Sequence, residues 1–440
     1  MKMKLKIPLV ATLLLSISAC GPAPQEKGAG TGTASAAQAA DTLLLNGKIY
    51  TLDPQQPWVE AVAVKDGKYS FAGSTEDAEQ FRGETTEVID LDGRMAMPGI
   101  NDTHLHPVMG GLKELYECSF PFSATPDQIA ATIKQCAQDN PDTQWIIGGQ
   151  WDSNLFINHQ IDSPRALLDE AAGDKAVLLH SDSGHDGWVN SKALQLAGVD
   201  KNTPEVEGGV IGRDQASGEP NGILLENAKS LVTAIVPMWR AEQYEAAVEH
   251  AVEVANQYGI TGLKDAWASP GALAGYKSVA DAGHLNAHVA TAIDVTLGIE
   301  DDVFDISKIE RLRDQYAAPG LDTRFVKIFM DGVPTSSRTA AMLADYLPTE
   351  VGGHRHNGSL HYAPERLADL MTQLDQAGFT VKVHTAGDRS VRVTLDAIEQ
   401  VRAANGNSGL RHELAHAEFV DEQDLPRFAQ LQAVADLSPY

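Results

Sequence analysis

Seven apolar, strand-like segments alternate with longer helical stretches after Gly99, and this alternation limits the possible folds more than any other feature. Parallel strands need long crossover connections, which are usually helices, so the pattern predicts a parallel α/β fold. The predicted strands are residues 100–106, 259–267, 286–295, 324–333, 379–388, 411–419 and 432–440. Seven strands are one fewer than a closed (β/α)8 barrel of the TIM type contains.

A long segment, residues 107–258, separates the first two predicted strands and is too large for one crossover helix. It contains strand-like runs of its own at 145–151 and 176–190, which predicts an insertion that covers the mouth of the barrel. Helical patterns at 243–259 and 365–378 each end in glycine, as helices commonly do.

Residues 41–97 are short alternating segments separated by the turn dipeptides Asn46-Gly47, Asp66-Gly67 and Asp92-Gly93. Such dipeptides are typical of tight β-turns between strands. We therefore predict a small antiparallel β domain that precedes the barrel of residues 98–440.

The first twenty residues resemble a bacterial lipoprotein signal peptide. Three lysines precede an apolar run, Ile7 to Ile17, that is too short to span a membrane, and the sequence Ile17-Ser18-Ala19-Cys20 resembles a lipobox. We expect lipidation at Cys20, and the alternative is an ordinary signal peptide with a chance cysteine. Residues 21–40 have the small, polar composition of a flexible linker. These features predict an exported lipoprotein, anchored to a membrane and facing the periplasm or the cell surface.

Charge and cysteine content limit the partners. With 34 Lys+Arg and 60 Asp+Glu, the net charge of -26 argues against nucleic acid or an anionic bilayer surface. The expected partner is a small-molecule substrate, with membrane contact through the lipid anchor only, and a homo-oligomer is left open. In an oxidising compartment Cys118 and Cys136 either form a disulfide or stay as buried free thiols.

Histidines and one lysine mark the predicted strand ends. His104 and His106 end the first strand, and residues i and i+2 of a strand point to the same side. Lys327, His384 and His416 lie in later strands, and barrel enzymes place their chemistry at the carboxyl ends of strands. Imidazole nitrogens suit zinc and similar ions, so the pattern predicts a site for one or two divalent metal ions, with zinc preferred.

Several longer motifs identify a family resemblance: NGKIYTLD, MPGINDTHLH, HDGWVNSKAL, VKIFMDGVPTSSRTAAML, VHTAGDRSVRVTLDAIE and RHELAHAEFVDEQDLPRF. From Asp41 to Tyr440 the sequence resembles the metal-dependent amidohydrolase superfamily and, within it, the amidohydrolase family 3 branch. The resemblance implies a distorted TIM-type barrel and a small β-sandwich domain that includes residues 41–97.

The resemblance also implies a mechanism and a ligand set. His104 and His106 would hold one metal, His384 and His416 the other, and Lys327 would be a carboxylated bridging lysine. A metal-activated hydroxide would then hydrolyse the carbon–nitrogen bond of a non-peptide amide or cyclic amide. A single-metal site with unmodified Lys327 stays open.

Some residues outside this set have two interpretations. His185 and Trp188 would shape the substrate pocket in the family, or they pack a lid. Arg338 would bind a substrate carboxylate, or it pairs locally. Glu226 and Asp265 have no assigned role. Three histidines in a Gly- and Asn-containing loop are predicted to be solvated or lid residues: His354, His356 and His361.

The sequence departs from the family pattern at its end. The family's eighth strand carries a general-base aspartate, whereas this sequence stops at Tyr440, inside the seventh predicted strand. Asp331 and Asp388 belong to other strand ends, and Asp436 is a poor substitute. We therefore expect the chain as written to be inactive or poorly folded, with an incomplete barrel. The second hypothesis is a catalytically inactive lipoprotein that binds a small molecule or a metal.

Overall fold

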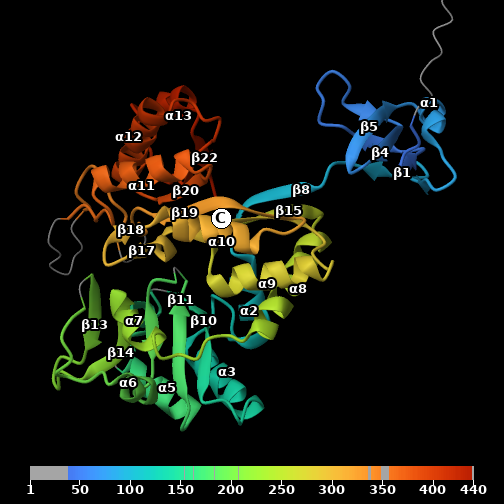
Figure 1. Ribbon diagram of the computed structural model, residues 1–440. Coiled ribbons are helices and arrows are strands. Elements are labelled where there is room, and N and C mark those ends of the chain that lie inside the picture. The colour runs from blue at the N-terminus through green and yellow to red at the C-terminus, as the bar shows by residue number, and fades with distance from the viewer. Residues whose placement is uncertain are drawn as a thin grey trace, which may run out of the picture. The chain divides into compact units, whose positions relative to one another are not determined.

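The computed structural model describes residues 38–438, with gaps at 153, 162, 183, 207, 335–337 and 348–355. The chain forms two compact units that divide between Pro98 and Gly99 (Figure 1). The predicted signal peptide with Cys20, most of the predicted linker, and His354 lie outside the described residues. Within the described ranges, no helix is both long enough and apolar enough to cross a membrane.

The first unit contains two small mixed sheets. One has the order β5 (Lys68–Gly73), β4 (Ala61–Lys65), β1 (Thr42–Leu45), β6 (Glu87–Asp90), and the other the order β3 (Trp58–Val59), β2 (Lys48–Tyr50), β7 (Met95–Ala96). The β4–β5 hairpin turns at Asp66-Gly67 as predicted, and both residues have positive φ. The antiparallel prediction is wrong for two pairs, because β1–β6 and β2–β7 are parallel. The chain reaches β6 through α1 (Thr75–Ala78) and η1 (Glu79–Phe81) rather than through a tight turn.

The second unit is built on a sheet of seven parallel strands. From one edge to the other these are β22 (Val434–Asp436), β21 (Glu413–His416), β20 (Thr380–Thr385), β19 (Leu321–Phe329), β16 (His288–Asp294), β15 (Ile260–Ala268) and β8 (Ile100–Leu105). All neighbouring pairs are parallel, and each strand overlaps a predicted one. The α/β prediction is thus confirmed, and the sheet is a nearly closed barrel of seven strands.

Helices pack around this sheet. They are α2 (Pro107–Tyr116), α8 (Ala241–Gln257), α9 (Pro270–Asp281), α10 (Ile306–Tyr316), α11 (Pro364–Gln376), α12 (Asp388–Asn405) and α13 (Leu425–Leu431). Their apolar faces share one hydrophobic core with the strands, which includes the fully buried Tyr276, Phe379 and Leu414. This continuous core fixes the strand ends, where the predicted site residues lie.

The edge strands β8 and β22 meet through side chains. No backbone ladder joins them in the described part of the chain. Instead, Asp436 of β22 accepts hydrogen bonds from the Thr103 hydroxyl at 3.0 Å and from Nδ1 of His104 at 2.8 Å. The gap between the edges is therefore bridged by polar contacts inside the barrel.

The insertion forms a six-stranded sheet between the first two barrel strands. Its order is β13 (Gly209–Arg213), β14 (Pro220–Glu226), β12 (Gly187–Val189), β11 (Ala176–Ser181), β10 (Trp145–Trp151), β9 (Cys118–Ser119). Its helices are α3 (Pro126–Asp139), α4 (Leu155–His159), α5 (Pro164–Ala172), α6 (Ser191–Ala197), η2 (Asn227–Lys229) and α7 (Ser230–Thr233). The predicted insertion, 107–258, is too wide at both ends because α2 and α8 pack together in the barrel core. Gly111 permits this approach, since a Cβ there would lie 2.4 Å from the Ala247 carbonyl oxygen.

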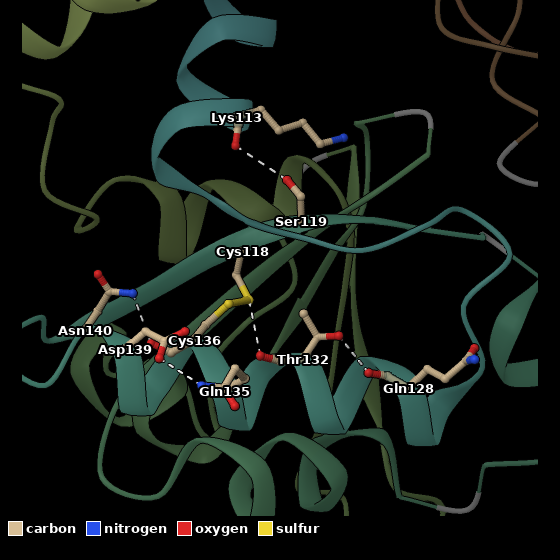
Figure 2. Close-up of a disulfide and its surroundings, with 9 residues drawn as sticks. All are labelled: Lys113, Cys118, Ser119, Gln128, Thr132, Gln135, Cys136, Asp139 and Asn140. Carbon is tan, nitrogen blue, oxygen red and sulfur yellow. Dashed lines mark hydrogen bonds between the residues drawn. A yellow bond between two sulfur atoms is a disulfide. The ribbon is translucent and has the colours of Figure 1, made fainter.

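A disulfide bond joins Cys118 in β9 to Cys136 in α3 (Figure 2). Of the two interpretations of these cysteines, the structure shows the paired one. The bond closes a segment with a sequence separation of 18 residues and ties the edge strand of the insertion sheet to the helix that follows it.

Replacing both cysteines by serine is expected to destabilise the insertion by about 3 kcal/mol, because a cross-link of this span removes chain entropy from the unfolded state. Urea unfolding of the wild type and of the Cys118→Ser/Cys136→Ser variant measures the difference. A reducing agent should lower the wild-type midpoint and leave the variant unchanged. Equal midpoints for the oxidised wild type and the variant would contradict the stabilising role.

Candidate functional site

The carboxyl ends of three barrel strands bring four histidines together. His104 lies near the end of β8 and His106 directly follows that strand. His384 lies near the end of β20, and His416 is the last residue of β21. Their rings form a continuous series, with centroid distances of 5.7 Å from His106 to His104, 4.7 Å from His104 to His416 and 4.6 Å from His416 to His384. These four side chains come from separate parts of the sequence and lie next to one another, as predicted from their positions at strand ends.

Burial keeps these imidazoles neutral. It lowers the pKa of His106 and of His416 to about 3, and nearby Lys327 adds to the effect in both. The pKa of His104 is also lowered by burial, although its hydrogen bond to Asp436 opposes the shift. Neutral imidazole is the form that binds a metal ion, so the site needs no proton release from histidine at pH 7.

Hydrogen bonds decide which ring nitrogens face the site. Nδ1 of His104 donates to Asp436, and the opposite Nε2 is buried without a hydrogen-bond partner. Nε2 of His384 donates to the Gly332 carbonyl oxygen at 2.9 Å. Each of these two rings therefore has one nitrogen committed to the protein, which leaves a lone pair on the other.

The backbone at the end of β21 is strained. His416 has a φ of 72° and Ala417 a φ of 44°, a region that residues with a Cβ rarely adopt. Such strain costs on the order of 1–3 kcal/mol and is typical of functional sites, where surrounding structure maintains it. Here it turns the chain at the point where the His416 ring lies between His104 and His384.

Lys327 lies in β19 and is only 1% exposed. Its Nζ is 4.8 Å from the ring centroid of Phe329, and no carboxylate of the described residues lies within ion-pair distance. Burial, and then the charge of Lys382, lowers the pKa of Lys327 to about 7. A substantial share of this amine is thus unprotonated near neutral pH.

A network of ion pairs fills the barrel interior near the histidines. Lys382 in β20 pairs with Asp436 and with Glu413, the latter at 2.8 Å, and Lys264 in β15 pairs with Glu413. Burial alone would raise the pKa of Asp436, but the His104 hydrogen bond and the Lys382 charge lower it below its usual range. Asp436, judged from the sequence to be a poor substitute for the family's general-base aspartate, therefore orients His104.

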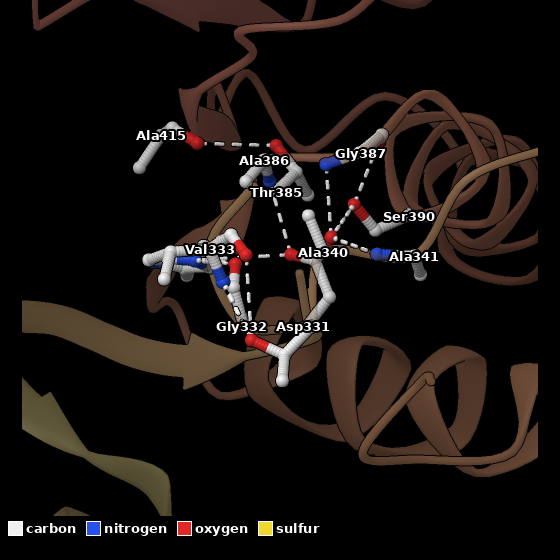
Figure 3. Close-up of polar contacts among 12 residues, drawn as sticks. Asp331, Gly332, Val333, Ala340, Ala341, Thr385, Ala386, Gly387, Ser390 and Ala415 are labelled. Atoms are coloured by element: carbon white, nitrogen blue, oxygen red, sulfur yellow. Dashed lines mark hydrogen bonds and ion pairs between the residues drawn. The ribbon is translucent and has the colours of Figure 1, made fainter. Parts of the chain in front are cut away.

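Asp331 follows β19 and ties three loops together (Figure 3). Its carboxylate is 1% exposed and accepts hydrogen bonds from the backbone N–H groups of Ala341, Ala386 and Gly387 and from the Ser390 hydroxyl, at 2.8–3.0 Å. These contacts fix the turn after β20 next to His384. The sequence showed no signal for this role beyond the position of Asp331 at a strand end.

The insertion contributes an acidic–imidazole pair. Nδ1 of His185 lies 2.7 Å from Oε2 of Glu226, whose other oxygen is buried without a hydrogen-bond partner. Burial would raise the pKa of Glu226, but His185, with contributions from Thr339 and His361, lowers it overall. His185 is also close enough to His384 to contribute to its lowered pKa. Glu226 has a φ of 49°, a further strained position.

Two predicted substrate-binding residues have local partners instead. Trp188 is 0% exposed, donates its Nε1–H to the Pro164 carbonyl oxygen and packs edge-on against Phe156. This agrees with the packing alternative for Trp188, which belongs to a hydrophobic core of the insertion. Arg338 donates to the Leu347 carbonyl oxygen and lies over the Tyr346 ring, as its local-pairing alternative predicted.

The remaining predicted residues are placed as follows. Asp265 is fully buried, accepts from the Tyr276 hydroxyl, and burial raises its pKa to about 7. His356 packs against Tyr346, and His361 lines a cavity beside the barrel. Asp388 accepts from the Leu343 backbone N–H. None of these side chains joins the series of four histidines.

The donor set fits a divalent metal ion. Across the described ranges, no three His, Cys, Asp or Glu side chains already stand in metal-binding geometry. The fit is chemical: four neutral imidazoles adjoin one another, and Nε2 of His104 is buried without a partner. Imidazole nitrogen is a common ligand of zinc and of similar ions.

Comparison with known proteins identifies the family. The protein-family model described as "Amidohydrolase family" matches residues 87–440. The chain belongs to the amidohydrolase family. This amidohydrolase is similar to the putative amidohydrolase YtcJ of Bacillus subtilis (strain 168), with 31% identity over 90% of this chain and 72% of the relative. It is also similar to an N-substituted formamide deformylase of Arthrobacter pascens, with 30% identity over 91% of this chain and 72% of the relative.

Solved structures support the fold of the amidohydrolase. A crystal structure described as an uncharacterized metal-dependent hydrolase from Pyrococcus horikoshii OT3 aligns with a TM-score of 0.67 and 22% identity. The alignment covers 89% of this chain and 73% of that chain. Family membership makes the chain a hydrolase, and the barrel places its four histidines at the strand ends where such enzymes carry their chemistry.

Changing Asp331 to Ala is expected to destabilise the amidohydrolase by about 3 kcal/mol or more, because buried N–H groups and the Ser390 hydroxyl lose their acceptor. The matched control is Asp388→Ala, which removes one exposed acceptor for Leu343 and should cost about 1 kcal/mol. Chemical unfolding measures both. Equal losses in the two variants would show that Asp331 does not hold the loops together.

Proposed function

We propose that the chain hydrolyses the carbon–nitrogen bond of a non-peptide amide, linear or cyclic, with the help of one or two divalent metal ions, preferably zinc. The observation that carries the proposal is the continuous series of four histidine rings at the barrel strand ends, beside the buried Lys327. The name of the Arthrobacter relative, a deformylase of N-substituted formamides, suggests formamides as the first compounds to test.

His104 and His106 would hold one cation, and His384 and His416 the second. A bound divalent cation lowers the pKa of water and polarises a carbonyl group, which is the chemistry that amide hydrolysis needs. Lys327 would bridge the two positions after carboxylation of its amine by carbon dioxide. Burial favours the unprotonated amine of Lys327, which is the form that reacts with carbon dioxide.

Residues around the ligands do the positioning. Asp436 keeps the proton of His104 on Nδ1, and the Gly332 carbonyl keeps that of His384 on Nε2. Hydrogen bonds to the second nitrogen of a ligand histidine fix its tautomer and ring orientation. Asp331 holds the turn that follows His384, and Glu226 holds His185 on the insertion side.

We also propose that the chain works outside the cytoplasm as a lipoprotein anchored through Cys20. The Cys118–Cys136 disulfide supports this location, because such bonds persist in oxidising compartments. Labelling with a radioactive fatty acid, lost in Cys20→Ser, tests the anchor.

Metal content is the first test. The chain purified with zinc should bind one or two zinc ions, as measured by elemental analysis, and His104→Ala/His106→Ala should lose at least one. His250→Ala is the control, because His250 pairs with Glu114 on the surface, away from the barrel histidines. Unchanged zinc in the double variant would contradict the proposed ligands. Zinc binding without hydrolysis of any formamide or cyclic amide would instead support the inactive binding protein.

Lysine carboxylation has a separate test. Wild-type protein equilibrated with 13C-labelled bicarbonate should show a carbamate signal by NMR, and Lys327→Arg should abolish it, because a guanidinium is not carboxylated. Lys264→Arg is the matched control, since Lys264 is already paired with Glu413. Hydrolysis of formamides should fall at least about a hundredfold in Lys327→Arg only. A signal that persists in Lys327→Arg would assign the modification to another lysine.

A further inference from the structure

A cavity of about 420 Å³ adjoins the candidate site. Its lining includes Asp294, Ile299, Asp302, Phe329, His361 and Tyr362. The Phe329 ring is also in contact with the candidate site, since it lies 5.5 Å from the ring of His384 and 4.8 Å from Nζ of Lys327. One wall of the cavity is therefore shared with the residues proposed to act on the amide, and the cavity is placed to receive the rest of a substrate.

Aromatic side chains give the cavity rigid walls. Phe329, the last residue of β19, is packed edge-on by Trp267 at 5.5 Å, and Trp267 donates its Nε1–H to Asp294 at 2.7 Å. Burial, and then the nearby Asp294, raises the pKa of Tyr362, so its phenol is neutral at pH 7. The faces of such rings attract cations because of the ring quadrupole.

Two carboxylates add negative charge, and neither forms an ion pair with a side chain of the described residues. Asp294, the last residue of β16, accepts only from neutral donors: Thr296 through its N–H and hydroxyl, and Trp267. Asp302 lies in the turn between β17 (Ile299–Glu300) and β18 (Val303–Phe304), and its carboxylate forms no hydrogen bond or ion pair within the described residues. The cavity thus combines neutral aromatic rings with carboxylates that form no ion pair in the described part of the chain.

Arg366 lies beside the turn that carries Asp302, and its charge is already balanced. The guanidinium of Arg366 donates to the backbone carbonyl of Asp302 at 3.0 Å and pairs with the Asp369 carboxylate at 3.5 Å. Asp369 does not line the cavity. The buried Lys327 is close enough to Asp294 for that carboxylate to oppose the lowering of the Lys327 pKa. His361, the remaining titratable group of the lining besides Tyr362, is anchored by its backbone N–H, which donates to the Met330 carbonyl oxygen.

We propose that this cavity is the specificity subsite of the hydrolase and that it selects substrates with a compact organic cation, such as a primary ammonium, a few carbons from the scissile amide. The inference rests on the proposed function, because it names the class of amide that the same site takes. Asp302 and Asp294 pair with the cation, while Phe329 and Tyr362 surround its alkyl chain.

A pair of formamides that differ in one charge tests the subsite: N-formylbutylamine and mono-N-formyl-1,4-diaminobutane. The wild type should prefer the cationic compound by about tenfold in kcat/KM, the scale of a partly desolvated cation contact. Asp302→Asn should raise KM for the cationic compound and remove most of this preference. Asparagine tolerates the positive φ of Asp302, so the turn should persist.

The matched control is Asp301→Asn, which neutralises the adjacent residue of the same turn. Asp301 also has a positive φ, but it does not line the cavity. The preference should survive in this variant. Equal kcat/KM for the two formamides in the wild type, or equal effects of the two substitutions, would overturn the proposal, while hydrolysis of the neutral formamide would still support the proposed function.

Calorimetric binding of butylamine and of its neutral analogue 1-butanol tests the subsite without catalysis. We expect butylamine, which is a cation at neutral pH, to bind the wild type and Asp301→Asn more tightly than 1-butanol does, and to bind Asp302→Asn about tenfold more weakly. Equal binding of both compounds by the wild type would overturn the subsite whether or not any formamide is hydrolysed. Selective binding with no hydrolysis would support the subsite and count against the proposed reaction only.

Discussion

The ammonium of Lys382 connects both edges of the barrel from the inside. It extends from β20 to the Thr103 carbonyl oxygen of β8 at 3.2 Å, to Glu413 of β21 and to Asp436 of β22. Since β8 and β22 share no backbone ladder in the described residues, these contacts and the Asp436–His104 hydrogen bond hold the edges in register. Loss of one partner would leave a buried charge uncompensated, which costs several kcal/mol.

The same network explains the protonation of the site. Three lysines, Lys264, Lys327 and Lys382, share the barrel interior with two carboxylates, Glu413 and Asp436. The carboxylates pair with Lys264 and Lys382, so the charge of Lys327 is the surplus one, and burial then favours its neutral form. Neutral histidines beside a readily deprotonated lysine give a site with little positive charge of its own. A divalent cation can enter it without strong repulsion.

Strand periodicity and the strand-end rule were enough to predict the seven barrel strands and the convergence of His104, His106, His384 and His416. Both depend on local sequence and on parallel topology. The parallel pairing of β1 with β6 was missed because it depends on a crossover of the chain rather than on a turn signal. The orienting role of Asp436 was missed for a related reason, since it requires knowing that β22 and β8 become neighbours across the barrel. The two interpretations of Trp188 stayed open because a buried and a substrate-facing tryptophan have the same sequence signature.

The proposed metal ligands and the proposed substrate-selecting residues lie in different parts of the fold. The histidines lie at strand ends fixed by a shared core, whereas Asp302 and Glu226 lie in a turn and at the end of an insertion strand, both with positive φ. Strand ends tolerate little movement, which suits a metal site that needs fixed distances. Turns can change sequence without disturbing the core, which suits residues that select one substrate over another. Phe329 belongs to both parts, because it ends a barrel strand, contacts His384 and forms a wall of the cavity. On this proposal, a change in the cavity that leaves Phe329 in place alters substrate choice while the four histidines stay where they are.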